Sequence, residues 1–268
     1  MNINISICQF KITDNKKENI SKAKYYIEKA STKSSFIVLP ECFVCPYDIN
    51  LFEENAEFLK DNDDSPTVKM LIQASKMKSN IYIIGGTIIE KEIIDGKQYL
   101  YNTCLVLYNG EIVSKYRKIN LYKINLKNHK FCEADVLTSG DLPTIVNTLY
   151  GKIGIGICYD LRFGELAKYY QENECKIVFY PGSFNRITGP KHWCLLQQAR
   201  AIDNQIYIVS CSAACSFGSK YESWGKSYVI SPWGEIVGET KQDEEDLKEV
   251  VINYDLIKTI RTMLPILG

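Results

Sequence analysis

The chain has only two histidines, His129 and His192, among its 268 residues, and this scarcity restricts its metal chemistry. A structural zinc site is usually built from four cysteine and histidine ligands. Cys42 and Cys45 have the C-x-x-C spacing, but no second pair with that spacing follows them. We therefore expect neither a metal nor a cofactor. The pair could instead be redox-active, but the proline that follows it, Pro46, favours a loop over the start of a helix.

An excess of charge is also missing, since 32 basic and 32 acidic side chains give a formal net charge of zero. A broad nucleic-acid-binding surface needs a basic excess, so we expect no nucleic-acid partner. No apolar run approaches the ~18 residues of a membrane span, and no signal-peptide pattern opens the sequence. The ten cysteines, several of them in apolar runs, then fit free thiols in a reducing compartment. We expect a cytoplasmic protein that does not bind a membrane.

Strand and helix patterns alternate through the first half of the chain. Apolar residues alternate with polar ones over 2–10, which predicts a half-buried strand, and an amphipathic helix pattern covers 20–30. The other elements predicted here are buried strands at 36–39 and 81–86, a helix from Ser65 as N-cap to about Ser79, and a hairpin that turns at Asn109-Gly110. This alternation indicates an α/β fold.

The second half repeats the alternation. Its predicted elements are strands at 153–158, 177–180 and 206–211, helices at about 163–172 and 191–204, and a hairpin around 231–234. The likeness of the halves indicates either a duplication or two layers of one sandwich. Because no Pro/Gly/Ser-rich linker separates them, we expect one domain over residues 1–268.

A cysteine lies at a predicted strand-to-helix turn. In Gly154-Ile155-Gly156-Ile157-Cys158-Tyr159-Asp160 the apolar run ends at Cys158, and a helix is expected soon afterwards. Backbone N–H groups at the start of a helix lower the pKa of a thiol and can bind an oxyanion. Cys158 is therefore either a nucleophile or a buried core cysteine.

A nucleophilic thiol needs a neighbouring base. His192 is one candidate, whereas His129 lies in a lysine-rich segment that we expect to be exposed. Glu41 is the other, because it closely follows the buried strand 36–39 at the sheet edge where α/β sites form, and burial raises a carboxyl pKa toward that of a general base. The alternative is a solvated glutamate. Lys118, after the first hairpin, is either an oxyanion-stabilising cation or a surface lysine.

The segments around these residues together resemble the nitrilase superfamily of carbon–nitrogen hydrolases. The resemblance covers nearly the whole chain and is strongest to the omega-amidase branch. It rests on PECF (40–43), YRKINLY (116–122), GICYDLRFGEL (156–166), YPGSFN (180–185), TGPKHW (188–193) and ARAIDNQ (199–205). The implied fold is α/β, a four-layer α–β–β–α sandwich whose layers are completed on dimerisation.

The resemblance implies a triad of Glu41, Lys118 and Cys158. Glu41 would take the thiol proton, deliver it to the leaving ammonia and then activate water, while Cys158 would form a thioester. Lys118 and the backbone N–H of Tyr159 would hold the oxyanion. Glu133 would position Lys118 and the substrate amide. Because a carboxylate serves as the base in this mechanism, the scarcity of histidine does not argue against it.

Some positions differ from the patterns usual in this superfamily. Asn120, Cys194 and Gln198 replace residues more common in omega-amidases, but none belongs to the triad. The deaminated-glutathione amidase branch usually has threonine where this chain has Asn185 and proline where it has Gly164. Both of these differences favour the omega-amidase branch.

The resemblance implies a substrate class, namely the terminal amides of short 2-oxo dicarboxylic acid monoamides such as 2-oxoglutaramate and 2-oxosuccinamate. The distal carboxylate of such a substrate needs a cation or hydroxyl donors. Arg162, four residues after Cys158 in the first turn of the next helix, is the candidate cation unless it pairs with Glu165 or Asp160. Tyr47 and Thr188 are candidate hydroxyl donors.

Two other functions remain open for the same residues. One is deaminated-glutathione amidase activity, and the other is a catalytically silent binding module on the same fold. The resemblance also implies a homodimer that pairs through the predicted helices at about 163–172 and near Lys191.

Overall fold

Two β-sheets face each other in the computed structural model, which describes residues 1–30, 32–126, 129–215 and 221–266. One sheet has the order β15-β1-β2-β3-β5-β4 with β6 paired to β5, and the other has the order β14-β13-β12-β11-β10-β9. The strands of the first sheet are β1 (Asn2–Gln9), β2 (Phe36–Val38), β3 (Tyr82–Ile84), β4 (Ile88–Ile94), β5 (Lys97–Tyr108), β6 (Glu111–Arg117) and β15 (Asp246–Asn253). Those of the second are β9 (Thr144–Thr148), β10 (Gly151–Ile155), β11 (Ile177–Pro181), β12 (Tyr207–Cys211), β13 (Tyr228–Ile230) and β14 (Ile236–Glu239).

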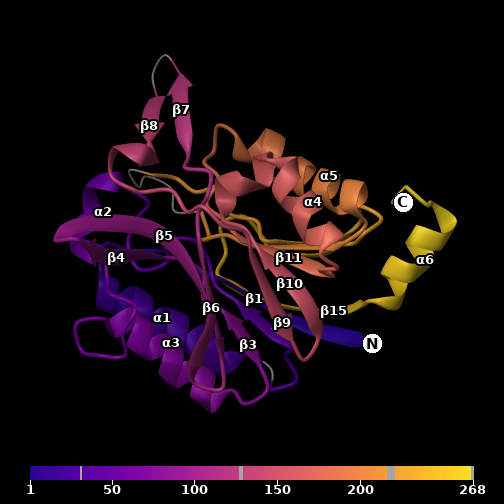
Figure 1. The fold of residues 1–268 in the computed structure, drawn as a ribbon, viewed down its shortest axis with the longest axis horizontal. Helices are drawn as coiled ribbons and strands as arrows, with labels where there is room; N and C mark the ends of the chain where they lie inside the picture. The colour runs from indigo at the N-terminus through magenta and orange to yellow at the C-terminus, as the bar shows by residue number, and fades with distance from the viewer. Residues whose placement is uncertain (31, 127–128, 216–220, 267–268) are drawn as a thin grey trace.

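Helices cover the outer face of each sheet (Figure 1). On the first sheet these are α1 (Lys16–Lys29) and α3 (Pro66–Met77), and on the second they are α4 (Gly164–Glu172) and α5 (Cys194–Asn204). The α–β–β–α order is the one that the sequence predicts. All four layers belong to one chain, however, so dimerisation is not needed to complete them, contrary to our expectation.

The core between the sheets is built from apolar side chains of both. The rings of Phe36 on β2 and Phe179 on β11 have their centroids 5.1 Å apart, which places the two central parallel strands face to face. The prediction of a half-buried first strand is wrong, because β1 pairs with β15 and β2 along its two edges and its residues from Ile5 to Gln9 are buried on both faces. Its polar residues Ser6 and Gln9 are buried and hydrogen-bonded instead of solvated.

The predicted hairpins and the predicted start of a helix at Ser65-Pro66 are confirmed. Asn109 and Gly110 have φ of 50° and 86°, the pair of positive values that a two-residue type I′ turn requires. Ser65 stands at the N-cap of α3, but its side chain makes no cap hydrogen bond. The carboxylate of Glu57 accepts from the backbone N–H groups of Thr67 and Val68 instead, so a residue distant in sequence satisfies the free N–H groups of this helix.

The remaining elements belong neither to the two large sheets nor to the helices that cover them. They are α2 (Ile49–Asn55), β7 (Lys123–Leu126), β8 (His129–Cys132), α6 (Asp255–Met263), the short 3₁₀ turns η1 (Glu133–Asp135) and η2 (Cys158–Arg162), and the π-helical turn η3 (Gly189–Trp193). The β7–β8 ribbon projects from the sandwich (Figure 1). The expected exposure of the His129 side chain lies outside the described residues. The single helix predicted for 191–204 is in fact η3 followed by α5.

None of the helices in the described parts of the chain combines the length and the apolar character that a membrane span requires.

Candidate active site

Two parallel strands from different sheets deliver Glu41 and Cys158 to one place. Glu41 follows β2 by three residues and Cys158 follows β10 by three, so both lie at carboxyl ends of strands. The two side chains lie next to each other, so that each influences the pKa of the other, and they are 1% and 5% exposed. Burial removes the alternative of a solvated Glu41, and the contact places a carboxylate base beside the thiol.

Lys118 joins this pair from the end of β6. Its backbone is fixed on both sides, because its N–H donates to the carbonyl of Asn102 and its carbonyl accepts from the N–H of Gly140. Its Nζ lies 3.1 Å from Oε1 of Glu41 and 2.9 Å from Oε2 of Glu133, and all three side chains are buried. Lys118 is therefore not a surface lysine but the cation between two buried carboxylates.

The backbone at Cys158 is strained in a way typical of functional sites. Its φ is 47°, in the left-handed region that a non-glycine residue rarely occupies, and it begins the 3₁₀ turn η2. Asp160 holds this turn, since one carboxylate oxygen accepts from the N–H of Ile157 at 2.9 Å and from the hydroxyl of Tyr116 at 2.8 Å. The other accepts from the backbone and side-chain N–H groups of Asn120 at 2.8 and 2.9 Å. Asn120 thus supports the turn that carries Cys158.

The protonation states of the cluster follow from its burial and its charges. Burial, and then the nearby carboxylate of Glu41, raise the pKa of Cys158 well above its ordinary value of 9.0. Burial also raises the pKa of Glu41, against the attraction of Lys118. For Lys118 burial acts to lower the pKa, but the carboxylates of Glu133 and Glu41 outweigh it and the pKa is raised. The resting thiol therefore keeps its proton until a base removes it.

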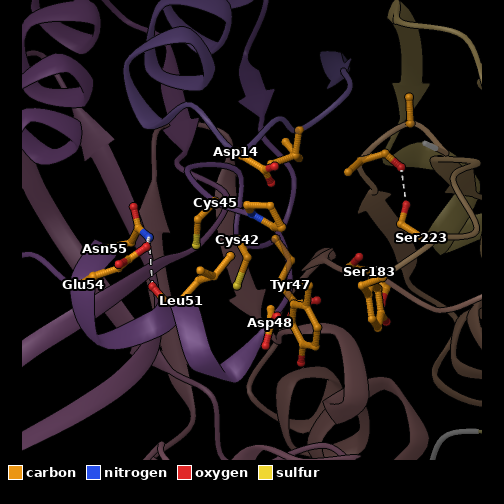
Figure 2. A pocket seen from close by; sticks show the side chains of 16 residues that line it. Asp14, Cys42, Cys45, Tyr47, Asp48, Leu51, Glu54, Asn55, Ser183 and Ser223 are labelled. Carbon is orange, nitrogen blue, oxygen red and sulfur yellow. Dashed lines mark hydrogen bonds between the residues drawn. The ribbon is translucent and has the colours of Figure 1, made fainter. Parts of the chain in front are cut away.

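Two cavities meet at this cluster. The larger, about 550 Å³, is lined by Glu41, Tyr47, Ser183 and Tyr221 among others. Figure 2 shows Cys42, Cys45 and Tyr47 at its centre, the α2 residues Leu51, Glu54 and Asn55 on one side, and Ser183 and Ser223 on the other.

The smaller cavity is lined by Cys158, and its free volume of about 10 Å³ holds roughly one water molecule. It also has Ser183 and Tyr221 in its wall, as the larger cavity does. A substrate bound at Cys158 must therefore use space from both.

The structure places the other predicted site residues around these cavities. Arg162 and Thr188 line the small cavity together with Cys158 and Tyr159. We expected Arg162 in the first turn of the following helix, α4. It lies instead in the 3₁₀ turn η2 that precedes this helix. The hydroxyl of Tyr47 is already engaged, because it donates to Oε1 of Glu133 at 2.5 Å.

Among the described residues, Arg162 forms no salt bridge with either of the expected partners, Glu165 and Asp160. Asp160 is engaged with Ile157, Tyr116 and Asn120, and the hydrogen bond of the Arg162 guanidinium runs to His192. The Nε of Arg162 is buried and has no hydrogen-bond partner among the described residues. His192, the alternative candidate for the base, contacts this arginine, whereas the thiol contacts Glu41.

The sequence matches the profile of the carbon–nitrogen hydrolases over residues 4–262. The chain belongs to the carbon–nitrogen hydrolase family. This hydrolase is 44% identical over 267 residues to "Omega-amidase, chloroplastic" of Arabidopsis thaliana, covering 98% of this chain and 71% of that relative. It is 38% identical over 265 residues to "Omega-amidase NIT2" of Homo sapiens, covering 98% of this chain and 92% of the human one.

Solved structures support the fold of the hydrolase. Nit3 of Saccharomyces cerevisiae, a member of branch 10 of the nitrilase superfamily, superposes with a TM-score of 0.90 at 33% identity, covering 100% of this chain and 96% of its own. The resemblance that the sequence shows to this superfamily is thus confirmed.

Sequence reasoning missed several residues that complete the site of this hydrolase. Asn102, fully buried on β5, donates from Nδ2 to Oε1 of Glu41 at 3.0 Å. A polar side chain inside the apolar run Leu100–Leu107 was a signal, because a buried polar group needs a partner. Tyr221 lines both cavities, but nothing in its own segment marks it.

Within the described parts of the hydrolase, no group of three or more histidine, cysteine, aspartate and glutamate side chains is placed to hold a metal ion. Cys42 and Cys45 are free thiols in a loop, as Pro46 predicts. Burial raises the pKa of Cys45 to about 12, so it carries little of the reactive thiolate that redox chemistry requires.

Proposed function

We propose that this hydrolase is an omega-amidase, which hydrolyses the terminal amide of 2-oxo dicarboxylic acid monoamides such as 2-oxoglutaramate and 2-oxosuccinamate to the acid and ammonia. The buried contact between Glu41 and Cys158, with Lys118 alongside, carries the reaction type. The names of its relatives, omega-amidases at 38–44% identity, support the substrate class.

The first half of the proposed reaction is acylation. Glu41 accepts the thiol proton as the sulfur of Cys158 attacks the amide carbon, because the raised thiol pKa leaves no standing thiolate. The oxyanion that forms is held by the Nζ of Lys118 and the backbone N–H of Tyr159. Glu41 then gives the proton to the amide nitrogen, the C–N bond breaks, ammonia leaves and a thioester remains on Cys158.

The second half is hydrolysis of that thioester. Glu41, again ionised, takes a proton from a water molecule whose oxygen attacks the thioester carbon. The C–S bond breaks, the sulfur regains the proton from Glu41, and the free acid leaves. Glu133 touches Lys118 through both of its oxygens, which fits the role of positioning this cation and the substrate amide.

We assign the distal carboxylate of the substrate to Arg162. This guanidinium lines the same cavity as Cys158, and its buried Nε lacks a partner among the described residues. Thr188 lies in the same wall, and its hydroxyl already donates to Asn185. Tyr47 belongs to the larger cavity, where its hydroxyl is shared with Glu133 and Lys118.

Release of ammonia from 2-oxoglutaramate tests this proposal. We expect turnover by the wild-type chain and none by Cys158→Ala. Hydrolysis of deaminated glutathione in preference to 2-oxoglutaramate would move the hydrolase to that branch. Absence of ammonia from both amides would favour a silent binding module, although a module without catalysis has no need for the Glu41, Lys118, Glu133 and Cys158 cluster.

We further propose that the hydrolase is a cytoplasmic homodimer whose single domain spans residues 1–268. The apolar side chains of Tyr169 on α4 and of Leu195 and Ile202 on α5 are 40%, 63% and 44% exposed, which suits pairing through these helices. Light scattering at micromolar concentration checks the dimer, and a monomer with full activity would refute it.

A further inference from the structure

Arg162 and His192 make a hydrogen bond whose direction is fixed by chemistry. Nη1 of Arg162 lies 3.2 Å from Nδ1 of His192. A guanidinium carries only donors, so Nδ1 must be the acceptor. The imidazole is therefore neutral and carries its proton on Nε2.

This hydrogen bond engages the Nη1 end of the guanidinium. Nη1 is occupied by His192, whereas Nε is buried and has no partner among the described residues. Nε–H and one Nη2–H point the same way on the planar group, and such a parallel pair matches the two oxygens of a carboxylate. The aromatic rings of Phe184 and Tyr159 lie beneath the guanidinium, with centroids 4.9 and 5.4 Å from Cζ.

The local fold holds His192 in this place. It lies in the π-helical turn η3, and its N–H donates to the carbonyl of Thr188 at 2.8 Å. The next residue, Trp193, is fully buried and donates from its indole N–H to the carbonyl of Lys226 at 2.6 Å. Gly189 begins the turn directly against the side chain of Trp224, where a Cβ would collide. Turns of this kind recur at functional sites.

We propose that His192 is a positioning residue for substrate recognition: its neutral imidazole orients Arg162 so that the Nε–Nη2 edge receives the distal carboxylate of the substrate. This inference rests on the proposed function of the hydrolase and adds a residue and a pH dependence to it. His192 does not touch the reacting atoms, so it acts on the binding of carboxylate-bearing substrates and leaves the chemistry at Cys158 unchanged.

Protonation of His192 abolishes the acceptor. The charged groups that act on this imidazole are both cations, Arg162 from η2 and the adjacent Lys191 of its own turn. Tyr122, which lines the same cavity as Arg162, stays neutral because burial raises its pKa to about 12. Burial, and then these two cations, lower the pKa of His192 below 6.5. Recognition of the carboxylate is therefore complete at neutral pH and is lost as the pH falls through that lowered value.

Paired substrates separate this effect from the chemistry. 2-Oxoglutaramate carries the distal carboxylate, and 4-oxopentanamide is the matching amide with a methyl group in its place. The ratio of their kcat/KM values cancels the titration of Glu41 and Cys158, which both substrates need. For the wild-type enzyme we expect this ratio to be constant at neutral pH and to fall as the pH drops through the lowered pKa of His192, below 6.5. A ratio that rises in acid would overturn the inference, since it would mean that protonated His192 attracts the carboxylate directly.

Two variants test the role of the acceptor. His192→Ala should raise KM for 2-oxoglutaramate about 3- to 10-fold, the size of one modest hydrogen bond, with kcat and the neutral amide unchanged. His192→Asn offers an amide oxygen near the position of Nδ1 and does not titrate, so it should restore KM and remove the acidic fall in the ratio. Lys191→Ala, an exposed neighbour, is the control and should leave KM within twofold. Equal effects of His192→Ala on both substrates would refute a role in carboxylate recognition.

The tautomer gives a readout that is independent of activity. With only two histidines in the chain, His129→Asn leaves His192 as the single imidazole, and its ¹⁵N shifts identify the protonated nitrogen. We expect a proton on Nε2 and an unprotonated Nδ1 at neutral pH, and the reverse tautomer would overturn the inference. If the wild-type enzyme released no ammonia from 2-oxoglutaramate, the proposed function would fail, whereas an active enzyme with unaffected His192→Ala kinetics would refute this inference alone.

Discussion

Glu41 and Lys118 are 77 residues apart in the sequence, yet Oε1 of one lies 3.1 Å from Nζ of the other, and both side chains are buried. Such a pair is costly to desolvate and is sustained here by further partners, Asn102 on Glu41 and Glu133 on Lys118. Oε2 of Glu41 has no hydrogen-bond donor among the described residues, and it belongs to the carboxylate that adjoins Cys158. The predictions below follow from this arrangement.

Cys158→Ala should abolish turnover and leave the fold intact, because it removes the only proposed nucleophile and one small side chain. Ammonia release and a thermal melt check the two parts of this prediction. The wild-type enzyme, quenched during turnover, should also show a mass increase equal to the acyl group on Cys158. Release of ammonia by the variant at a rate near that of the wild type would exclude the covalent route.

Glu41→Gln keeps the shape of the side chain but cannot accept a proton, so kcat should fall by about 10²–10⁴-fold. Glu54→Gln, which changes an exposed carboxylate of the larger cavity, is the matched control and should keep most of its activity.

The same base sets the acid limb of the wild-type pH profile. Burial raises the pKa of Glu41 above 4.5, and the base must be ionised to act, so kcat/KM falls as the pH drops through this raised value. An acid limb with its midpoint below pH 4.5 would contradict the assignment of Glu41 as the base.

Lys118→Met should lower kcat on the order of 10²–10³-fold, because the oxyanion loses its cation. It should also destabilise the fold by about 3–5 kcal/mol, since Glu41 and Glu133 would be left buried without a counter-charge. The acid limb of the remaining activity should move to higher pH, because Lys118 lowers the pKa of Glu41 in the wild-type enzyme.

Lys115→Met serves as the control for Lys118. Lys115 lies on β6, three residues before Lys118, and it pairs with Glu90 while 42% of its own side chain is exposed. It should change neither kcat nor the acid limb. Denaturant unfolding and pH profiles of both variants check the prediction. If Lys118→Met kept most of the wild-type kcat, Lys118 would not be the cation that holds the oxyanion.

Arg162→Met should raise KM for 2-oxoglutaramate by about 10- to 150-fold, which corresponds to the ~1.5–3 kcal/mol of a charged hydrogen bond. A neutral amide without the distal carboxylate should lose little. Arg186→Met, which removes an exposed guanidinium that pairs with Glu222, is the control. Steady-state kinetics of each variant on both substrates test this prediction. Equal losses of kcat/KM on both substrates would mean that Arg162 supports the fold and does not bind the carboxylate.

The sequence by itself determined the α/β class and the order of most elements, and it singled out Glu41, Lys118 and Cys158, which the structure brings together. The ends of two strands can be read from the local sequence, because one apolar run stops at Leu39 and another at Cys158. The hairpin turn at Asn109-Gly110 is also local, because it needs positive φ values that these two residues tolerate. The motifs around Glu41, Lys118 and Cys158 indicated the family, and the match to the family profile over residues 4–262 agrees with them.

Only the tertiary structure decided which side chains are buried and which of them meet. Periodicity reports one face of a strand, so it could not show that side chains on both faces of β1 are buried, in part by elements distant in sequence. Nor could it show that Glu57 caps α3, that Asn102 reaches Glu41, or that Arg162 turns to His192 and not to an acidic neighbour. Each of these contacts joins residues at least 10 positions apart, and its free energy depends on the exclusion of water by the packed sheets, a property of the whole fold that no local segment encodes.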